Sequence, residues 1–148
     1  MINDDIKRKI AILQGYLNTL VPYAELPTED LLKNIEKLST MERYFILMAD
    51  EAFDVNGALA YQLGNNIPES NKSTFLELVD LNMLDRGFAE KIAESAKTRN
   101  RLVHNYEKVQ KSVMIEDMKR FTEMYKEYIK ILTLKFVAKE PAQDQESQ

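Results

Sequence analysis

At 148 residues, with 45% hydrophobic and 30% charged residues, the chain suits one soluble globular domain and is too short for two comfortable ones. It contains no cysteine, which excludes disulfides, thiolate nucleophiles and cysteine-based zinc sites. A net charge of −4 excludes a general nucleic-acid binder, so any contact with a polyanion must be local.

The N-terminus is charged and polar, without the apolar core of a signal peptide. No run of about 18 uncharged apolar residues occurs, so we expect no membrane-spanning helix and a cytoplasmic protein. Apolar residues then recur at helical spacing, which predicts a first helix that stops before Pro22. Its stripe consists of Ile2, Ile6, Ile10, Leu13, Leu17 and Leu20.

Capping residues divide the next part of the chain. Thr28, which follows a proline and precedes two acids, is expected to cap a short helix that ends near Leu38. Ser39 or Thr40 then caps a long third helix over about 41–63.

The second half follows the same pattern. The loop at 64–68 ends the long helix, and Ser73 is expected to cap a short one. Asp85 starts a helix that continues without interruption through the region that contains the histidine, and Ser112 is a possible cap for the last helix. The polar tail, 138–148, cannot bury apolar surface and is expected to be disordered.

These elements predict an all-α fold. We expect an up-down helical bundle of four main helices plus one or two short ones, occupying residues 1–137. No repeat and no convincing strand is visible.

The run from Arg99 to Tyr106 holds the only histidine of the chain, His104. On a helix with 100° per residue, Tyr106 falls within about 20° of Arg99. Asn100 and His104, four residues apart, lie on the adjoining stripe and can touch. These four side chains therefore share one broad sector of the helix.

The residue types in this sector suit chemistry on a phosphodiester. Histidine transfers protons near neutral pH, and the guanidinium of arginine matches a phosphate. With Asn100 beside Arg99, this is a minimum set for metal-free cleavage, so we expect no metal and no cofactor. A lone helical histidine is nevertheless more often structural than catalytic.

Cations gather around the same run. Between Lys97 and Lys111 there are five Lys and Arg residues and one acid, which gives a local charge of +4 in a chain of net charge −4. Such a basic segment can hold a polyanion at one place. The alternative is chance clustering on a solvated helix face.

An arginine also continues the apolar stripe formed by Phe88, Ile92, Ala96, Arg99, Val103 and Tyr106. A guanidinium on a buried stripe must be paired or open into a cleft. One solution is a homodimer in which this sector faces a second copy across a two-fold axis. The small residues Ala89, Ala93 and Ala96 are expected to allow close helix approach there.

The run resembles the Arg-x4-His-x-Tyr motif of the HepT-like toxins, which belong to the HEPN superfamily of helical, usually dimeric ribonucleases. The layout of about Met1 to Val137 also fits that family. The resemblance implies a toxin that cleaves RNA, in a reaction in which the 2′-hydroxyl of the RNA attacks the adjacent phosphate. It also implies silencing by a partner, a minimal (MntA-like) nucleotidyltransferase antitoxin that adds AMP to the motif tyrosine.

Carried over residue by residue, the resemblance makes Arg99 and His104 catalytic and Asn100 a support for the site. Tyr106 becomes the acceptor of AMP. Arg101 is outside the family's essential pair and is assigned only a backbone-phosphate or surface role.

An alternative site and two alternative functions are also compatible with the sequence. The acids Asp50, Glu51 and Asp54 could in principle bind Mg²⁺, but a solvated face or partner contacts is the simpler interpretation. The rival function is a non-catalytic helical partner or substrate subunit of a nucleotidyltransferase. A third is a structural RNA-binding module without cleavage, against which the acidic remainder of the chain argues.

Overall fold

The computed structural model describes residues 3–104 and 110–137, and within these ranges the chain forms seven α-helices and no strand. The predicted all-α bundle is confirmed. The helices are α1 (Asp4–Ala24), α2 (Thr28–Lys33), α3 (Ile35–Gly64), α4 (Asn71–Asp80), α5 (Arg86–Ala93), α6 (Ser95–His104) and α7 (Lys111–Phe136). None of the helices in this described part is long and apolar enough to cross a membrane.

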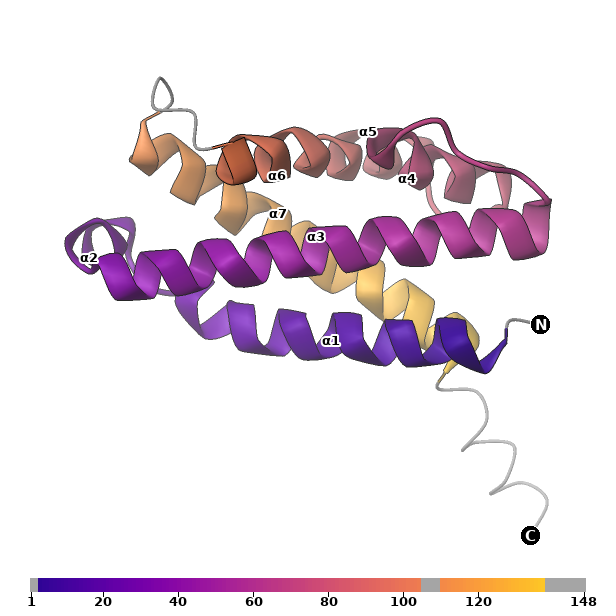
Figure 1. Ribbon diagram of the computed structural model, residues 1–148, viewed down its shortest axis with the longest axis horizontal. Helices are drawn as coiled ribbons and strands as arrows, with labels where there is room; N and C mark the ends of the chain where they lie inside the picture. The colour runs from indigo at the N-terminus through magenta and orange to yellow at the C-terminus, as the bar shows by residue number, and fades with distance from the viewer. Residues whose placement is uncertain (1–2, 105–109, 138–148) are drawn as a thin grey trace, which may run out of the picture.

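Helix α3 is the centre of the bundle (Figure 1). Helix α1 packs along one side of it, while α4 and α6 pack on the other. Helix α7 crosses the bundle diagonally and contributes to the core that it shares with the other helices. The segment that carries Arg99 is thereby laid against the middle helix of the fold.

The core forms because each long helix buries one apolar stripe. On α1 the predicted stripe from Ile6 to Leu20 is buried, while Ile2 lies outside the described residues. Helix α7 buries its large residues in the same way. At the centre, Phe75 of α4 makes edge-on contacts with two tyrosines of α7, Tyr125 and Tyr128.

Two helix boundaries in the first half differ from the prediction. Helix α1 continues past Pro22 to Ala24, because a proline in the last turn removes only one backbone hydrogen bond, and the Glu25 amide closes that turn on the Val21 carbonyl at 3.0 Å. Helix α2 is shorter than expected, because the extended backbone of Asn34 ends it. The Asn34 side chain then caps α3 by accepting a hydrogen bond from the Lys37 amide at 3.1 Å. The predicted caps Ser39 and Thr40 therefore lie inside α3.

Thr28 is also not a cap. It is the first residue of α2, follows Pro27 at the N-cap position, and its hydroxyl donates to the Glu116 carboxylate of α7. Side-chain bonding across helices has replaced the local cap. The contact fastens α2 to the start of α7.

Caps in the second half shift by a few residues. Ser70 rather than Ser73 caps α4, and the two serines bond each other's backbone reciprocally as a capping box. Asp85 caps α5 as predicted, by accepting from the Phe88 amide. Gln110 precedes α7 in place of Ser112.

Buried polar groups tie four helices together. Tyr128 donates to Asn56 of α3, whose amide donates to Thr74 of α4 at 3.2 Å. At the start of α6, Ser95 shares a 2.9 Å hydrogen bond with the Tyr125 hydroxyl. Because buried polar groups are costly when unpaired, these bonds specify the relative placement of α3, α4, α6 and α7.

Candidate active site

The predicted continuous helix from Asp85 is broken at Glu94. Helix α5 ends at Ala93, and the Glu94 amide donates to the Lys91 carbonyl at 3.1 Å, the short spacing of a closing turn. Helix α6 then starts at Ser95, which is fully buried and anchored to Tyr125. Helix α6 packs against α3, and this packing brings Arg99 to a residue of α3.

Arg99 is held by Asp50 of α3. Its Nε donates to one Asp50 carboxylate oxygen at 2.7 Å, and its Nη2 donates to the other at 3.1 Å. The side chains are 24% and 42% exposed, so the pair lies at the edge of the core. A bidentate, charge-assisted pair fixes the plane of the guanidinium.

The remaining nitrogen of the same guanidinium is directed along α6. Arg99 Nη1 donates to Asn100 Oδ1 at 3.2 Å. Together these bonds use three of the five N–H donors of an arginine, and the side chain keeps partial exposure. A fixed guanidinium at an accessible edge is suited to an anionic ligand.

The other predicted site residues differ in solvent exposure, and one of them is not among the described residues. Arg101 is half-buried, and His104 is exposed as the last residue of α6. Tyr106 lies outside the described residues. Arg99 and Asn100 are brought together by a direct bond, whereas the contact between Asn100 and His104 stays a prediction.

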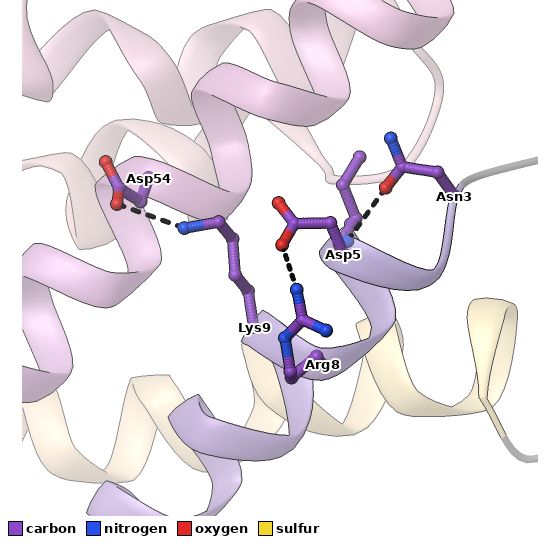
Figure 2. Close-up of polar contacts among 6 residues, drawn as sticks. Asn3, Asp5, Arg8, Lys9 and Asp54 are labelled. Atoms are coloured by element: carbon purple, nitrogen blue, oxygen red, sulfur yellow. Dashed lines mark hydrogen bonds and ion pairs between the residues drawn. The ribbon is translucent and has the colours of Figure 1, made fainter.

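The acids on α3 do not form one solvated face. Asp50 belongs to the arginine site, and Asp54 lies one turn further on, with Lys9 of α1 at 3.4 Å (Figure 2). Between them, Glu51 has one carboxylate oxygen that is buried and unpaired among the described residues. Burial raises the pKa of Glu51, Lys9 opposes this, and the negative charge of Asp54 adds to it.

The alanines expected at a dimer interface are used inside the chain. Ala89, Ala93 and Ala96 are at most 6% exposed because they pack into the chain's own core. Val103, expected on the same buried stripe, is 44% exposed. The structure therefore contradicts close approach of a second copy through these alanines. It also meets the pairing requirement of Arg99 within one chain.

The basic segment is only partly a free patch. Lys97 is exposed on α6, whereas Lys111 at the start of α7 acts on Glu42 of α3. Burial raises the pKa of Glu42, and the positive charge of Lys111 works against that rise. Two members of the segment, Glu107 and Lys108, lie outside the described residues.

Asp50 is the site residue that sequence reasoning missed. Arg99 on an apolar stripe does indicate a carboxylate partner, but nothing in the sequence selects one among 24 acids. Asp50 is 49 positions away and one turn from another aspartate on the same helix. Only the crossing of α3 and α6 makes the choice.

The model of the family described as ribonuclease HepT-like matches residues 6–132. The chain is 24% identical over 139 residues to the curated tRNA nuclease HepT of Aphanizomenon flos-aquae (strain 2012/KM1/D3). That alignment covers 94% of this chain and 95% of the relative.

Solved structures agree in fold. A tri-AMPylated HEPN toxin of Shewanella oneidensis, in complex with an MNT antitoxin, superposes with a TM-score of 0.77 at 16% identity. The match covers 90% of this chain and 99% of the toxin. A toxin–antitoxin structure with AMP-PNP also gives 0.77, at 15% identity and with 89% and 99% covered. With its family match spanning most of its length, the chain belongs to the HepT-like ribonucleases.

Proposed function

We propose that this chain is the toxin of a toxin–antitoxin pair, an endoribonuclease that a nucleotidyltransferase antitoxin silences by modifying Tyr106. The observation that carries the proposal is Arg99, fixed by Asp50 at an accessible edge, five residues before the only histidine of a HepT-like chain. The name of the cyanobacterial relative, a tRNA nuclease, supports RNA as the substrate class and tRNA as the first substrate to test.

The reaction requires no external nucleophile. The RNA 2′-hydroxyl gives its proton to a general base and its oxygen bonds to the adjacent phosphorus. The bond from phosphorus to the 5′-oxygen breaks, and a general acid protonates that oxygen. His104 serves in this proton transfer, a role worth about 10²- to 10⁴-fold in rate. The products are a 2′,3′-cyclic phosphate and a 5′-hydroxyl, and no metal enters the scheme.

Arg99 stabilises the charge that develops on the phosphoryl oxygens. Asp50 acts through it as a positioning residue, since a fixed guanidinium requires no reorganisation during the reaction. Asn100 supports the same guanidinium from α6. Arg101, half-buried on the next position, contacts the RNA backbone.

The active form is a homodimer that places a second His104 in the cleft, so that one histidine takes a proton while the other gives one. The exposed end of α6 supports this arrangement, because His104 and Val103 both lie open there. Sedimentation velocity at micromolar concentration tests it. A monomeric coefficient for an active enzyme would rule out a shared site.

The proposed partner is a nucleotidyltransferase of the MNT type, acting in the cytoplasm. The Shewanella oneidensis toxin carries three AMP groups in complex with such an antitoxin, which supports AMP transfer as the regulatory chemistry. AMP on Tyr106 would add bulk and negative charge only seven residues along the chain from Arg99. It would then compete with RNA phosphate for the guanidinium.

The test is cleavage of total tRNA in the presence of a chelator, by the wild type and His104→Ala side by side. Mass spectrometry first confirms that neither protein carries AMP. Cleavage by the wild type alone, with cyclic-phosphate ends, is the expected result. No cleavage by either unmodified protein would favour the rival function, a non-catalytic partner of the transferase.

A second substrate tests the chemistry itself. An RNA with a 2′-deoxy sugar at the mapped cleavage site lacks the internal nucleophile, so it should resist cleavage. Cleavage of that substrate at the same position would overturn the proposed 2′-hydroxyl mechanism. A 2′-deoxy sugar one nucleotide away is the matched control and should be cut normally.

A further inference from the structure

A basic groove lies between the first turn of α4 and the exposed side of α6. Its volume is about 620 Å³. Three of its seven lining residues are cations, Lys72, Lys97 and Arg101, and none is an acid. In a chain of net charge −4, such a groove stands out as a local binding site for an anion.

The spacing of the cations suits an extended polyanion. Lys97 and Arg101 are four residues apart on α6, which places them on one face about 6 Å apart along the helix axis. Lys72 faces them from α4, which packs directly against α6. The first turn of α4 also presents the positive end of its helix dipole to the groove.

The groove is continuous with the arginine site. Asn100 lines the groove and at the same time accepts the hydrogen bond from Arg99 Nη1 at 3.2 Å. An anionic strand that places one phosphate at Arg99 can therefore continue into the groove past Asn100, where Arg101 and Lys97 lie on the same helix.

One of the three cations of the groove, Lys72, forms an ion pair with an acid that lies outside the groove. Lys72 Nζ lies 2.6 Å from Glu94, the residue at the break between α5 and α6. The hydrogen bond from Lys72 lowers the pKa of Glu94, with a further contribution from Lys97. Both side chains of the pair are about half exposed, so the bridge is weak and open to competition from a ligand.

We propose that this groove binds the backbone of single-stranded RNA on one side of the scissile phosphate, with Lys72, Lys97 and Arg101 as phosphate contacts. The inference rests on the proposed ribonuclease function for the identity of the strand. Glu94 holds Lys72 in the absence of RNA and releases it when a phosphate arrives. The groove reads charge and spacing, so it adds affinity without base preference.

The experiment measures RNA binding in the His104→Ala background, which avoids turnover. Anisotropy of a labelled single-stranded RNA is followed over a range of KCl concentrations for Lys97→Gln/Arg101→Gln. Loss of two phosphate contacts should make the slope of log K against log salt shallower by about 1.4. The affinity at 0.1 M salt should then fall about 25-fold.

The matched control removes the same charge elsewhere. Lys130→Gln/Lys135→Gln changes two exposed lysines in the last turns of α7, far along the bundle from α6 (Figure 1). It should leave the slope unchanged. Circular dichroism checks that every variant keeps its helices, and Lys97→Gln alone, at an exposed position, provides a variant in which folding is not at risk.

Glu94→Gln provides a gain rather than a loss. Removal of this charge frees Lys72 for RNA, so the variant should bind more tightly and with a steeper salt slope. A structural disturbance would not produce that result. Unchanged or weaker binding by Glu94→Gln would overturn the assignment of Lys72.

Equal affinity and slope for Lys97→Gln/Arg101→Gln and its parent would overturn the groove, as would an equal loss in the α7 control. The proposed function fails separately. If the unmodified wild type does not cleave RNA but the groove variants lose affinity as described, RNA binding by the groove is supported and the proposed ribonuclease activity is wrong. If the wild type cleaves RNA but the substitutions leave RNA affinity unchanged, the ribonuclease activity is supported and the proposed role of the groove is wrong.

Discussion

The carboxylate of Asp50 on α3 accepts two hydrogen bonds from the guanidinium of Arg99 on α6, at 2.7 and 3.1 Å. This pair joins the middle helix of the bundle to the helix that carries the motif. It offsets the free-energy cost of partly burying the charged guanidinium near the core, and it gives the guanidinium a single orientation. The pair is therefore both a packing device and a preparation for phosphate chemistry.

Asp50→Asn should lower ribonuclease kcat by up to about 100-fold, because a misplaced guanidinium loses contact with the developing charge. KM should change less, since the groove cations remain. The free energy of unfolding should fall by less than about 1 kcal/mol, as expected for a partly exposed pair. The control is Asp54→Asn, one turn further on, which should keep full activity. Unchanged kcat in Asp50→Asn would show that Asp50 serves packing alone.

Tyr106→Phe should remain toxic in cells that express the nucleotidyltransferase, because phenylalanine has no oxygen to accept AMP. Growth of co-expressing cultures provides the measurement, and intact-protein mass verifies that the variant carries no AMP. The double variant His104→Ala/Tyr106→Phe should be harmless and serves as the control. Rescue of growth by the transferase despite Tyr106→Phe would mean that binding alone neutralises the toxin.

Ser95→Ala should destabilise the fold by about 1–3 kcal/mol, because it leaves the fully buried Tyr125 hydroxyl without its partner. Denaturant unfolding measures the loss. Ser95→Ala/Tyr125→Phe removes both polar groups and should recover part of it. Strictly additive losses in the two single variants would show that the 2.9 Å bond does not couple α6 to α7.

Glu51→Gln should raise the melting temperature at pH 7 and have no effect well below pH 4.5, the ordinary value of its pKa. Burial raises the pKa of Glu51 in the folded state, so the folded protein binds a proton more tightly than the unfolded chain. The wild type is therefore penalised as the pH rises through this range, and glutamine removes the penalty. Melting curves at the two pH values measure the difference.

The control for this prediction is Asp54→Asn. Its carboxylate is exposed and pairs with Lys9, as Figure 2 shows. Its removal relieves only the smaller part of the Glu51 shift that comes from the Asp54 charge and also removes the Lys9 pair, so it should stabilise the protein at pH 7 much less than Glu51→Gln does. A gain at pH 7 that persists in acid would indicate better helix propensity in the Glu51 variant rather than relief of a buried charge.

Much of the fold follows from spacing along the chain. The stripe from Ile6 to Leu20 predicts α1, and the cap at Asp85 predicts the start of α5, because both signals are local. Local signals fail where a distant contact decides. Asn34 caps α3 although two hydroxyl residues follow it, and the chain turns at Glu94 although its sequence suits a helix.

The candidate site divides along the same line. The sequence alone determined that Arg99, Asn100 and His104 lie on one helix, because their spacing and the helical period are properties of a short segment. The tertiary structure alone decided that Asp50 pairs with Arg99, that the alanines of α5 and α6 are buried within the chain, and that Lys72 faces α6. These outcomes depend on where helices cross, and crossing is set by the packing of all their side chains together.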